Sequence, residues 1–109
     1  MLFYVVAYDI PDDKRRKKIA DLLEGYGSRV QYSVFECVLT QNKYQEMCSR
    51  LRKHFQEDED SLRFYPMSRH TLAQVETWGI GSRKIHIIWN FVMHCGVAFL
   101  LGSGINGNT

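Results

Sequence analysis

The sequence predicts an α+β domain with a ferredoxin-like β–α–β–β–α–β order, and three observations lead to this prediction. Runs of β-branched and aromatic residues alternate with two segments of helical periodicity over residues 1–67. A chain of 109 residues is long enough for one ordinary domain and too short for two. The composition, 45% hydrophobic and 24% charged, is typical of a folded protein. Two helices on one face of a four-stranded antiparallel sheet would leave the other face for a partner, so we also expect a homodimer.

The first strand is predicted over residues 2–8, an apolar run that ends at Asp9. We expect it to be a fully buried central strand. It does not fit a signal peptide, because it lacks a basic start and soon meets an aspartate. Pro11 and the two aspartates after it open an amphipathic helix of about four turns. Its apolar face comprises Ile19, Leu22, Leu23 and Tyr26.

The next elements follow from changes in hydrophobic periodicity. Residues 29–39 favour β-structure but change their apolar phase after Val34, which predicts two strands joined by a bend, bulge or short connection. Thr40 is expected to cap a second helix. The acidic residues 57–60 are interpreted as a solvated loop, and residues 61–67 as the last strand. The buried face of the second helix is predicted to comprise Tyr44, Met47, Cys48, Leu51 and Phe55.

The C-terminal part of the chain is less ordinary. Residues 1–81 are predicted to form the domain, and residues 82–109 an atypical apolar extension that supplies a final strand in one interpretation. Residues 72–78 fit either a short helix or a short strand. The mainly apolar run at 85–101 contains two histidines and an asparagine, so docking on the sheet or on a partner is favoured over membrane insertion or a poorly ordered extension.

Charge and cysteine content narrow the possible functions. The net charge is only +2, so any nucleic-acid-binding surface must come from local clustering of cations. Three cysteines cannot all pair, and they lack CxxC spacing, so neither a disulfide framework nor a zinc site is indicated. We therefore expect reduced thiols in a cytoplasmic protein. The histidines show no metal-binding spacing, and none is assigned to catalysis.

Asp9 is the leading candidate for chemistry. A carboxylate at the end of an apolar strand is costly unless it binds a metal, caps a helix or pairs with a cation. The residues alone leave two interpretations open. Asp9 caps the following helix, or the Asp9 side chains of a two-fold dimer share one divalent cation. Because carboxylates supply oxygen ligands, Mg²⁺ is the cation that would suit this shared site best.

A run of five cations at residues 14–18 follows, and it predicts either a phosphate-binding surface or a solvated helix face. Arg29 and Arg63 are candidates to extend this patch. Ser33 is expected either to face a phosphate or to satisfy the backbone at a bend. Three aromatic side chains would stack on bases or pack in the core: Tyr8, Tyr32 and Phe35.

Two separated motifs together resemble the small CRISPR-associated endoribonuclease family. They are YDIPDD at residues 8–13, ahead of the basic helix, and RVQYSVFEC at residues 29–37, after GYG. RFYP at residues 63–66 fits the family's later strand, and the resemblance covers roughly residues 1–81. It implies a ferredoxin-like homodimer in which Asp9 of each protomer binds Mg²⁺ for hydrolysis of phosphodiesters in RNA or DNA.

The resemblance also implies roles for individual residues. Asp9, Tyr8 and Ser33 would be catalytic, with Asp9 as the metal ligand. The implied nucleic-acid contacts are Arg15, Arg16, Lys18, Arg29 and Phe35. A second, non-enzymatic role is implied as well, in which the protein bridges dimers of the CRISPR adaptation integrase and binds spacer-precursor duplex DNA through its backbone. The chain departs from the family's pattern after Gly81.

Overall fold

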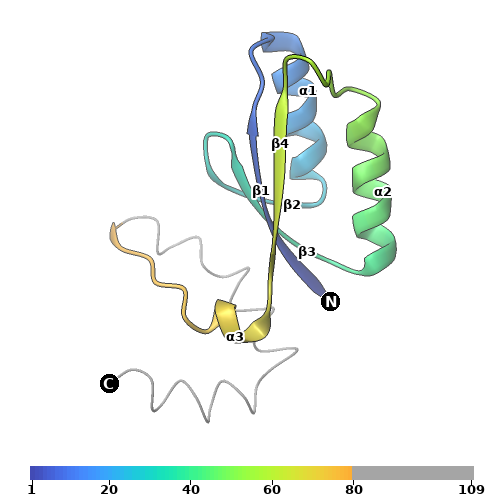
Figure 1. Ribbon diagram of the computed structural model, residues 1–109. Helices are drawn as coiled ribbons and strands as arrows, with labels where there is room; N and C mark the ends of the chain where they lie inside the picture. Colours follow the sequence, from blue (N-terminus) through green and yellow to red (C-terminus); the bar gives the residue numbers. More distant parts are fainter. Residues whose placement is uncertain (80–109) are drawn as a thin grey trace.

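The computed structural model describes residues 1–79, so the predicted extension at 82–109 lies outside the described residues (Figure 1). The elements in chain order are β1 (Leu2–Asp9), α1 (Asp13–Glu24), β2 (Gly27–Gln31), β3 (Val34–Leu39), α2 (Gln41–Arg52), β4 (Ser61–Met67) and α3 (Arg69–Leu72). The predicted strand at residues 61–67 is confirmed.

The strands form one antiparallel sheet in the order β2-β3-β1-β4, and α1 and α2 lie together against one face of it (Figure 1). The predicted α+β class is therefore confirmed. The element order and the placement of both helices on one side are consistent with the ferredoxin-like arrangement.

The core lies between the sheet and the two helices. Strand β1 is central, as predicted, but it is not fully buried. Val6 and Tyr8 are buried beneath the helices, whereas Val5 and Ala7 on the other face are half-buried. This difference arises because successive side chains of a strand point to opposite faces, and α1 and α2 cover only one of them.

Helix α1 begins where Asp12 caps it, since the Asp12 carboxylate accepts a hydrogen bond of 2.9 Å from the backbone N–H of Arg15. The alternative in which Asp9 caps this helix is therefore wrong, and Asp9 is left available for another role. Helix α2 is capped by Thr40, as predicted, and buries Met47 and Leu51.

The predicted split in residues 29–39 is confirmed, but the break falls earlier than the change in apolar phase. Strands β2 and β3 are joined by a two-residue turn, Tyr32 and Ser33, and β2 carries an irregularity between Arg29 and Gln31. Gly27 is required at the start of β2, because a Cβ there would lie 2.5 Å from Cys37 Sγ and closer still to the Glu36 carbonyl oxygen.

Two further expectations need correction or refinement. The acidic loop at 57–60 is not wholly solvated, because the Asp60 side chain has 0% exposed surface and pairs with Arg15. Residues 72–78 form neither the short helix nor the short strand that was expected: α3 covers Arg69–Leu72, and residues 73–78 form a turn and irregular chain. Gly79 has a φ of 74°, a conformation that favours glycine.

Within residues 1–79, no helix is long and apolar enough to cross a membrane. The apolar run at 85–101 lies outside this described part.

Candidate functional site

Asp9 is exposed at the C-terminal end of β1, which we call the tip of the strand. It pairs with Ser61 at the start of β4, and Ala7 pairs with Arg63 in the same ladder. These residues surround a hollow of about 260 Å³ that is lined by Ala7, Tyr8, Asp9, Ser61 and Arg63. The lining thus includes the Asp9 carboxylate, the Ser61 hydroxyl and the Arg63 guanidinium, a set that suits phosphodiester chemistry.

The oxygen donors at this hollow are of the type that a hard cation such as Mg²⁺ prefers, but only one of the lining residues is a carboxylate. The Asp9 carboxylate and the Ser61 hydroxyl are oxygen ligands, which Mg²⁺ prefers. Among residues 1–79, however, no group of three or more histidine, cysteine or acidic residues is placed to hold a metal ion. Among the described residues that line this hollow, Asp9 is thus the one acidic side chain that could hold a cation.

Tyr8 lies on the helix-facing side of β1, opposite to Asp9. Its hydroxyl donates a hydrogen bond of 3.3 Å to the Tyr32 carbonyl, and its backbone N–H donates one of 3.1 Å to the Ser33 carbonyl. Burial raises the pKa of the Tyr8 hydroxyl, so the group stays protonated at neutral pH. The predicted catalytic residues Tyr8 and Ser33 are thus neighbours through the turn, whereas the hollow at Asp9 includes Tyr8 but not Ser33.

A second hollow, of about 390 Å³, lies between α1 and the turn after β2. Tyr32 is 69% exposed at its edge, and the Arg29 guanidinium lies 5.9 Å from the centre of the Tyr32 ring. Both positive and negative side chains line this hollow, so its net field is weak. The lining residues are Tyr8, Asp13, Arg16, Lys17, Ala20, Asp21, Glu24, Arg29 and Tyr32.

The five cations at the start of α1 divide into two groups. Arg15 pairs with Asp60 and Glu59, so the phosphate contact predicted for it would require breaking an internal ion pair. Arg16 pairs with Asp13 and donates a hydrogen bond of 2.8 Å to the Ile10 carbonyl. These two arginines thus hold the residues on either side of the tip of β1, Asp60 before β4 and Ile10 after β1.

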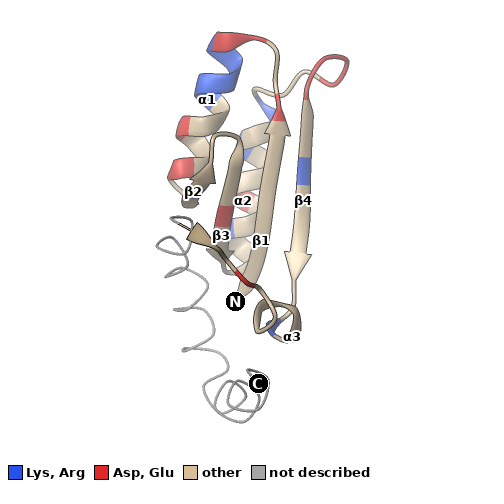
Figure 2. Ribbon diagram, turned by 90° about the vertical axis from the view of Figure 1, so that its left-hand side faces the viewer, with Lys and Arg blue, Asp and Glu red and all other residues tan. Residues whose placement is uncertain are grey.

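The lysines of this run face solvent. Lys17 pairs with Asp21 at 3.0 Å, whereas Lys14 and Lys18 have no ion-pair partner within the described part of the chain. Lys14 and Lys18 are four residues apart, so they lie on the same side of α1. Figure 2 shows this basic segment at the end of α1 that is next to the acidic tip of β1.

Phe35 was predicted to contact nucleic acid, and its environment contradicts a direct contact. The side chain has 0% exposed surface and belongs to the core beneath the helices. A base cannot stack on a ring that has no exposed face. The Arg29 guanidinium, 5.3 Å from the centre of the Phe35 ring, covers it from the side of the second hollow.

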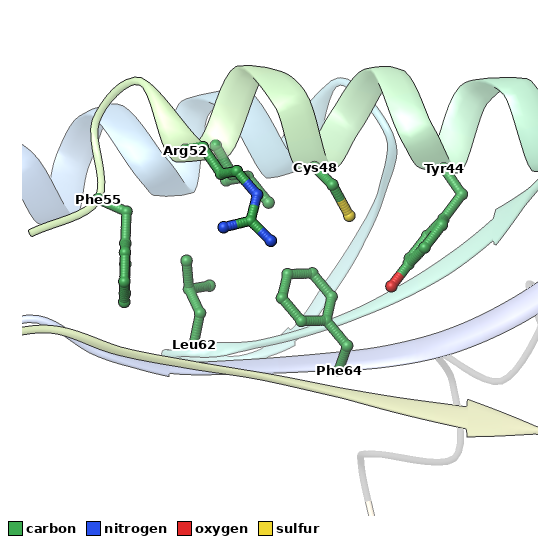
Figure 3. Close-up of a pocket in the computed structure, with 7 residues that line it drawn as sticks. Tyr44, Cys48, Arg52, Phe55, Leu62 and Phe64 are labelled. Atoms are coloured by element: carbon green, nitrogen blue, oxygen red, sulfur yellow. The ribbon is translucent and has the colours of Figure 1, made fainter. Parts of the chain in front are cut away.

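A third cavity, of about 240 Å³, lies between α2 and β4 (Figure 3). Its described lining is mainly apolar and has no carboxylate, so it offers no metal ligand of the kind found at Asp9. Its lining comprises Tyr44, Cys48, Leu51, Arg52, Phe55, Leu62 and Phe64.

Nucleophilic chemistry at the buried Cys37 is also disfavoured, because burial raises the pKa of the Cys37 thiol to about 12.

The contribution of Ser61 to the Asp9 hollow was missed by the sequence reasoning. Arg63 was placed in a cation patch but not beside Asp9. Neither neighbour follows from local pattern, because only the register of β1 against β4 brings them together. The one available signal was the period of two in residues 61–67, which places Ser61 and Arg63 on the same face.

The fold and site together define a small α+β protein with an acidic strand tip beside a basic helix. The family model described as CRISPR associated protein Cas2 matches residues 1–75. The chain belongs to the Cas2 family. This confirms the resemblance derived from the two motifs.

Relatives and solved structures agree with this assignment. A Synechocystis protein named CRISPR-associated endoribonuclease Cas2 3 is 70% identical over 79 residues, which cover 72% of this chain and 86% of that protein. Streptococcus pyogenes Cas2 has a crystal structure with a TM-score of 0.63 and 36% identity, covering 71% of this chain and 99% of the other. A chain of a partial Cas6-RT-Cas1–Cas2 complex has a TM-score of 0.64 and 31% identity, covering 71% and 84%.

Proposed function

We propose that this protein is a metal-dependent endonuclease that hydrolyses phosphodiesters in RNA or DNA and takes part in CRISPR adaptation. The observation that carries the proposal is the exposed Asp9 carboxylate at the tip of β1, in a hollow that also contains Arg63. Relatives are named endoribonuclease or endonuclease, which supports the same activity.

The active form would be a ferredoxin-like homodimer in which the sheet faces turned away from the helices bring two Asp9 side chains together. The two carboxylates would hold one Mg²⁺, which would polarise a phosphoryl oxygen and lower the pKa of a bound water. Asp9 would orient this water for attack, and Tyr8 would keep the tip of β1 in place through its bond to the Tyr32 carbonyl. Ser33 supports the same tip through its carbonyl.

Replacing Asp9 with asparagine should lower the cleavage rate by about 100-fold or more, because the only carboxylate of the hollow is lost. Folding should be unaffected, since Asp9 is exposed. The measurement is cleavage of a labelled RNA and of a labelled duplex DNA, with Mg²⁺ and with a chelator.

Asp58→Asn is the matched control for this prediction, because Asp58 is also an exposed carboxylate, in the loop before β4. It should retain the full rate. Equal rates for wild type and Asp9→Asn, or a rate that persists with the chelator, would contradict the proposed enzyme.

A second candidate function is architectural. In it the protein binds the backbone of spacer-precursor duplex DNA and bridges dimers of the adaptation integrase. Two observations favour it: Lys14 and Lys18 face solvent on one side of α1, and a similar chain occurs in a complex named for Cas1 and Cas2. This role requires no chemistry at Asp9.

Reversing both charges, with Lys14→Glu and Lys18→Glu, should weaken duplex DNA binding by about 10-fold or more at moderate salt. Each lost phosphate contact should also reduce the slope of log affinity against log salt concentration by about 0.9. Fluorescence anisotropy over a salt series measures both effects. The control is the pair Arg52→Glu and Lys53→Glu, an equal charge change on two exposed residues at the end of α2. Equal losses in the two variants would argue against a specific basic surface on α1.

A further inference from the structure

Arg63 lies on the same face of the sheet as Asp9. In the ladder between β1 and β4, Asp9 pairs with Ser61 and Ala7 pairs with Arg63. Side chains two residues apart in a strand share a face, so Asp9, Ser61 and Arg63 project together. The alternate residues of β4, Leu62 and Phe64, pack against the core under the helices. The two charged side chains therefore face away from α1 and α2.

The hollow that Asp9 and Arg63 line places opposite charges beside one another on neighbouring strands. Figure 2 shows the acidic tip of β1 next to the strand β4, which carries a basic segment. The hollow has a volume of about 260 Å³ and includes the Ser61 hydroxyl. It has room for a phosphodiester group together with water, and among its lining residues Arg63 supplies the cationic side chain.

Arg63 differs from Arg15 and Arg16 in having hydrogen-bond donors that no acidic side chain occupies. Arg15 and Arg16 each donate to an acidic partner, whereas Arg29, which also lacks such a hydrogen bond, does not line this hollow. Among the described residues, Arg63 has no ion pair, and its hydrogen bond to the Tyr65 hydroxyl is long, at 3.4 Å. The Arg63 guanidinium is exposed in the single chain, and beside the paired Asp9 side chains of the proposed dimer it would donate two parallel hydrogen bonds to a phosphate.

We propose that Arg63 is a catalytic residue that binds the scissile phosphodiester at the Asp9 hollow. This inference rests on the proposed nuclease function and names a group that binds its substrate. In hydrolysis, the water oxygen forms a new bond to phosphorus, and the bond from phosphorus to the leaving oxygen breaks. The leaving oxygen keeps that electron pair and takes up a proton, while the attacking water gives one up to solvent. Arg63 forms no covalent bond and stabilises the negative charge that develops on the phosphoryl oxygens.

The decisive experiment compares Arg63→Ala, Arg63→Lys and Arg52→Ala in cleavage of a fluorescein-labelled single-stranded RNA with Mg²⁺. Arg52 is an exposed arginine on α2, away from the hollow, so its loss removes the same charge elsewhere. Arg63→Ala should lower kcat by about 100-fold with a smaller change in KM, because the contact strengthens as charge develops. Arg63→Lys should recover part of the loss, since lysine keeps the charge but not the paired donors. A kcat for Arg63→Ala equal to that of Arg52→Ala would overturn the proposal.

A binding measurement separates failure of this inference from failure of the proposed function. In an Asp9→Asn background, which should not cleave, Arg63→Ala should still weaken RNA binding and reduce the salt slope by about 1. An unchanged affinity and slope would overturn the role of Arg63 even if the wild type is an active nuclease. Conversely, a wild type with no Mg²⁺-dependent cleavage would remove the nuclease function, and the binding result would then decide whether Arg63 contacts phosphate. Thermal unfolding of each variant checks that the fold is retained.

Discussion

Replacing Phe35 with alanine should lower the free energy of unfolding by ~3–5 kcal/mol, the usual cost of removing a large aromatic side chain from a core. Phe35 has 0% exposed surface and pairs with Val6 in the central ladder of the sheet. Its ring stacks with Tyr8 at 6.3 Å between centroids. Alanine would leave a cavity that the neighbouring strands cannot close without shifting the ladder. Urea unfolding followed by circular dichroism measures the loss.

Two further variants distinguish this core role from the base-stacking role that the sequence predicted for Phe35. Tyr32→Ala removes an aromatic ring that is 69% exposed in the adjacent turn, so stability should change by no more than about 0.5 kcal/mol. Phe35→Leu should fold and bind RNA within about two-fold of wild type. A tenfold loss of RNA binding by Phe35→Leu, at nearly unchanged stability, would show that the ring reaches the ligand.

Phe35 also illustrates what sequence reasoning can and cannot supply. Some strand and helix positions follow from local signals, such as the Thr40 cap of α2 and the period of two in residues 61–67, and the structure confirms these two. Whether a strand aromatic faces a ligand or a core depends on which side of the sheet the helices cover. That choice is made by the whole fold, so the sequence left both alternatives open for Phe35 and Tyr8.

The same limit applies to the candidate site. Asp9 could be singled out, because a carboxylate at the end of an apolar run is costly unless it has a partner. Its neighbours Ser61 and Arg63 are brought to it by the register of β1 against β4, which involves residues more than 50 positions apart. The acidic loop was misjudged for a related reason. Four consecutive acidic residues are typically solvated, and only the docking of α1 brings Arg15 to two of them, Glu59 and the buried Asp60.

Replacing Asp60 with alanine should lower the melting temperature of the protein by about 5–15 °C. The Asp60 side chain is 0% exposed, and its two oxygens accept bonds of 2.8 Å each from Arg15 Nε and a second guanidinium nitrogen. One oxygen also accepts a bond of 3.0 Å from the backbone N–H of Gln56. Alanine would leave these donors without their acceptor at the point where β4 begins. Differential scanning fluorimetry measures the shift, and Asp58→Ala, an exposed acid of the same loop, should change it little.

The same pair predicts how stability depends on pH. The Arg15 guanidinium, hydrogen-bonded to Asp60, holds the pKa of that carboxyl below its usual range. A carboxyl whose pKa is depressed by folding adds stability above its unfolded pKa of about 3.9. That stability is lost as the pH falls through the lower folded value. The stability difference between wild type and Asp60→Asn should therefore be constant from about pH 5 to 7 and shrink below about pH 4.

Urea unfolding at several pH values tests this dependence. A difference that grows on acidification would mean that the ion pair does not stabilise the fold. Because Ser61 follows Asp60 directly and pairs with Asp9, the Arg15–Asp60 contact also fixes the strand that forms one wall of the Asp9 hollow. Arg15, which was predicted to contact phosphate, thus affects the site indirectly, because it holds β4 against the tip of β1.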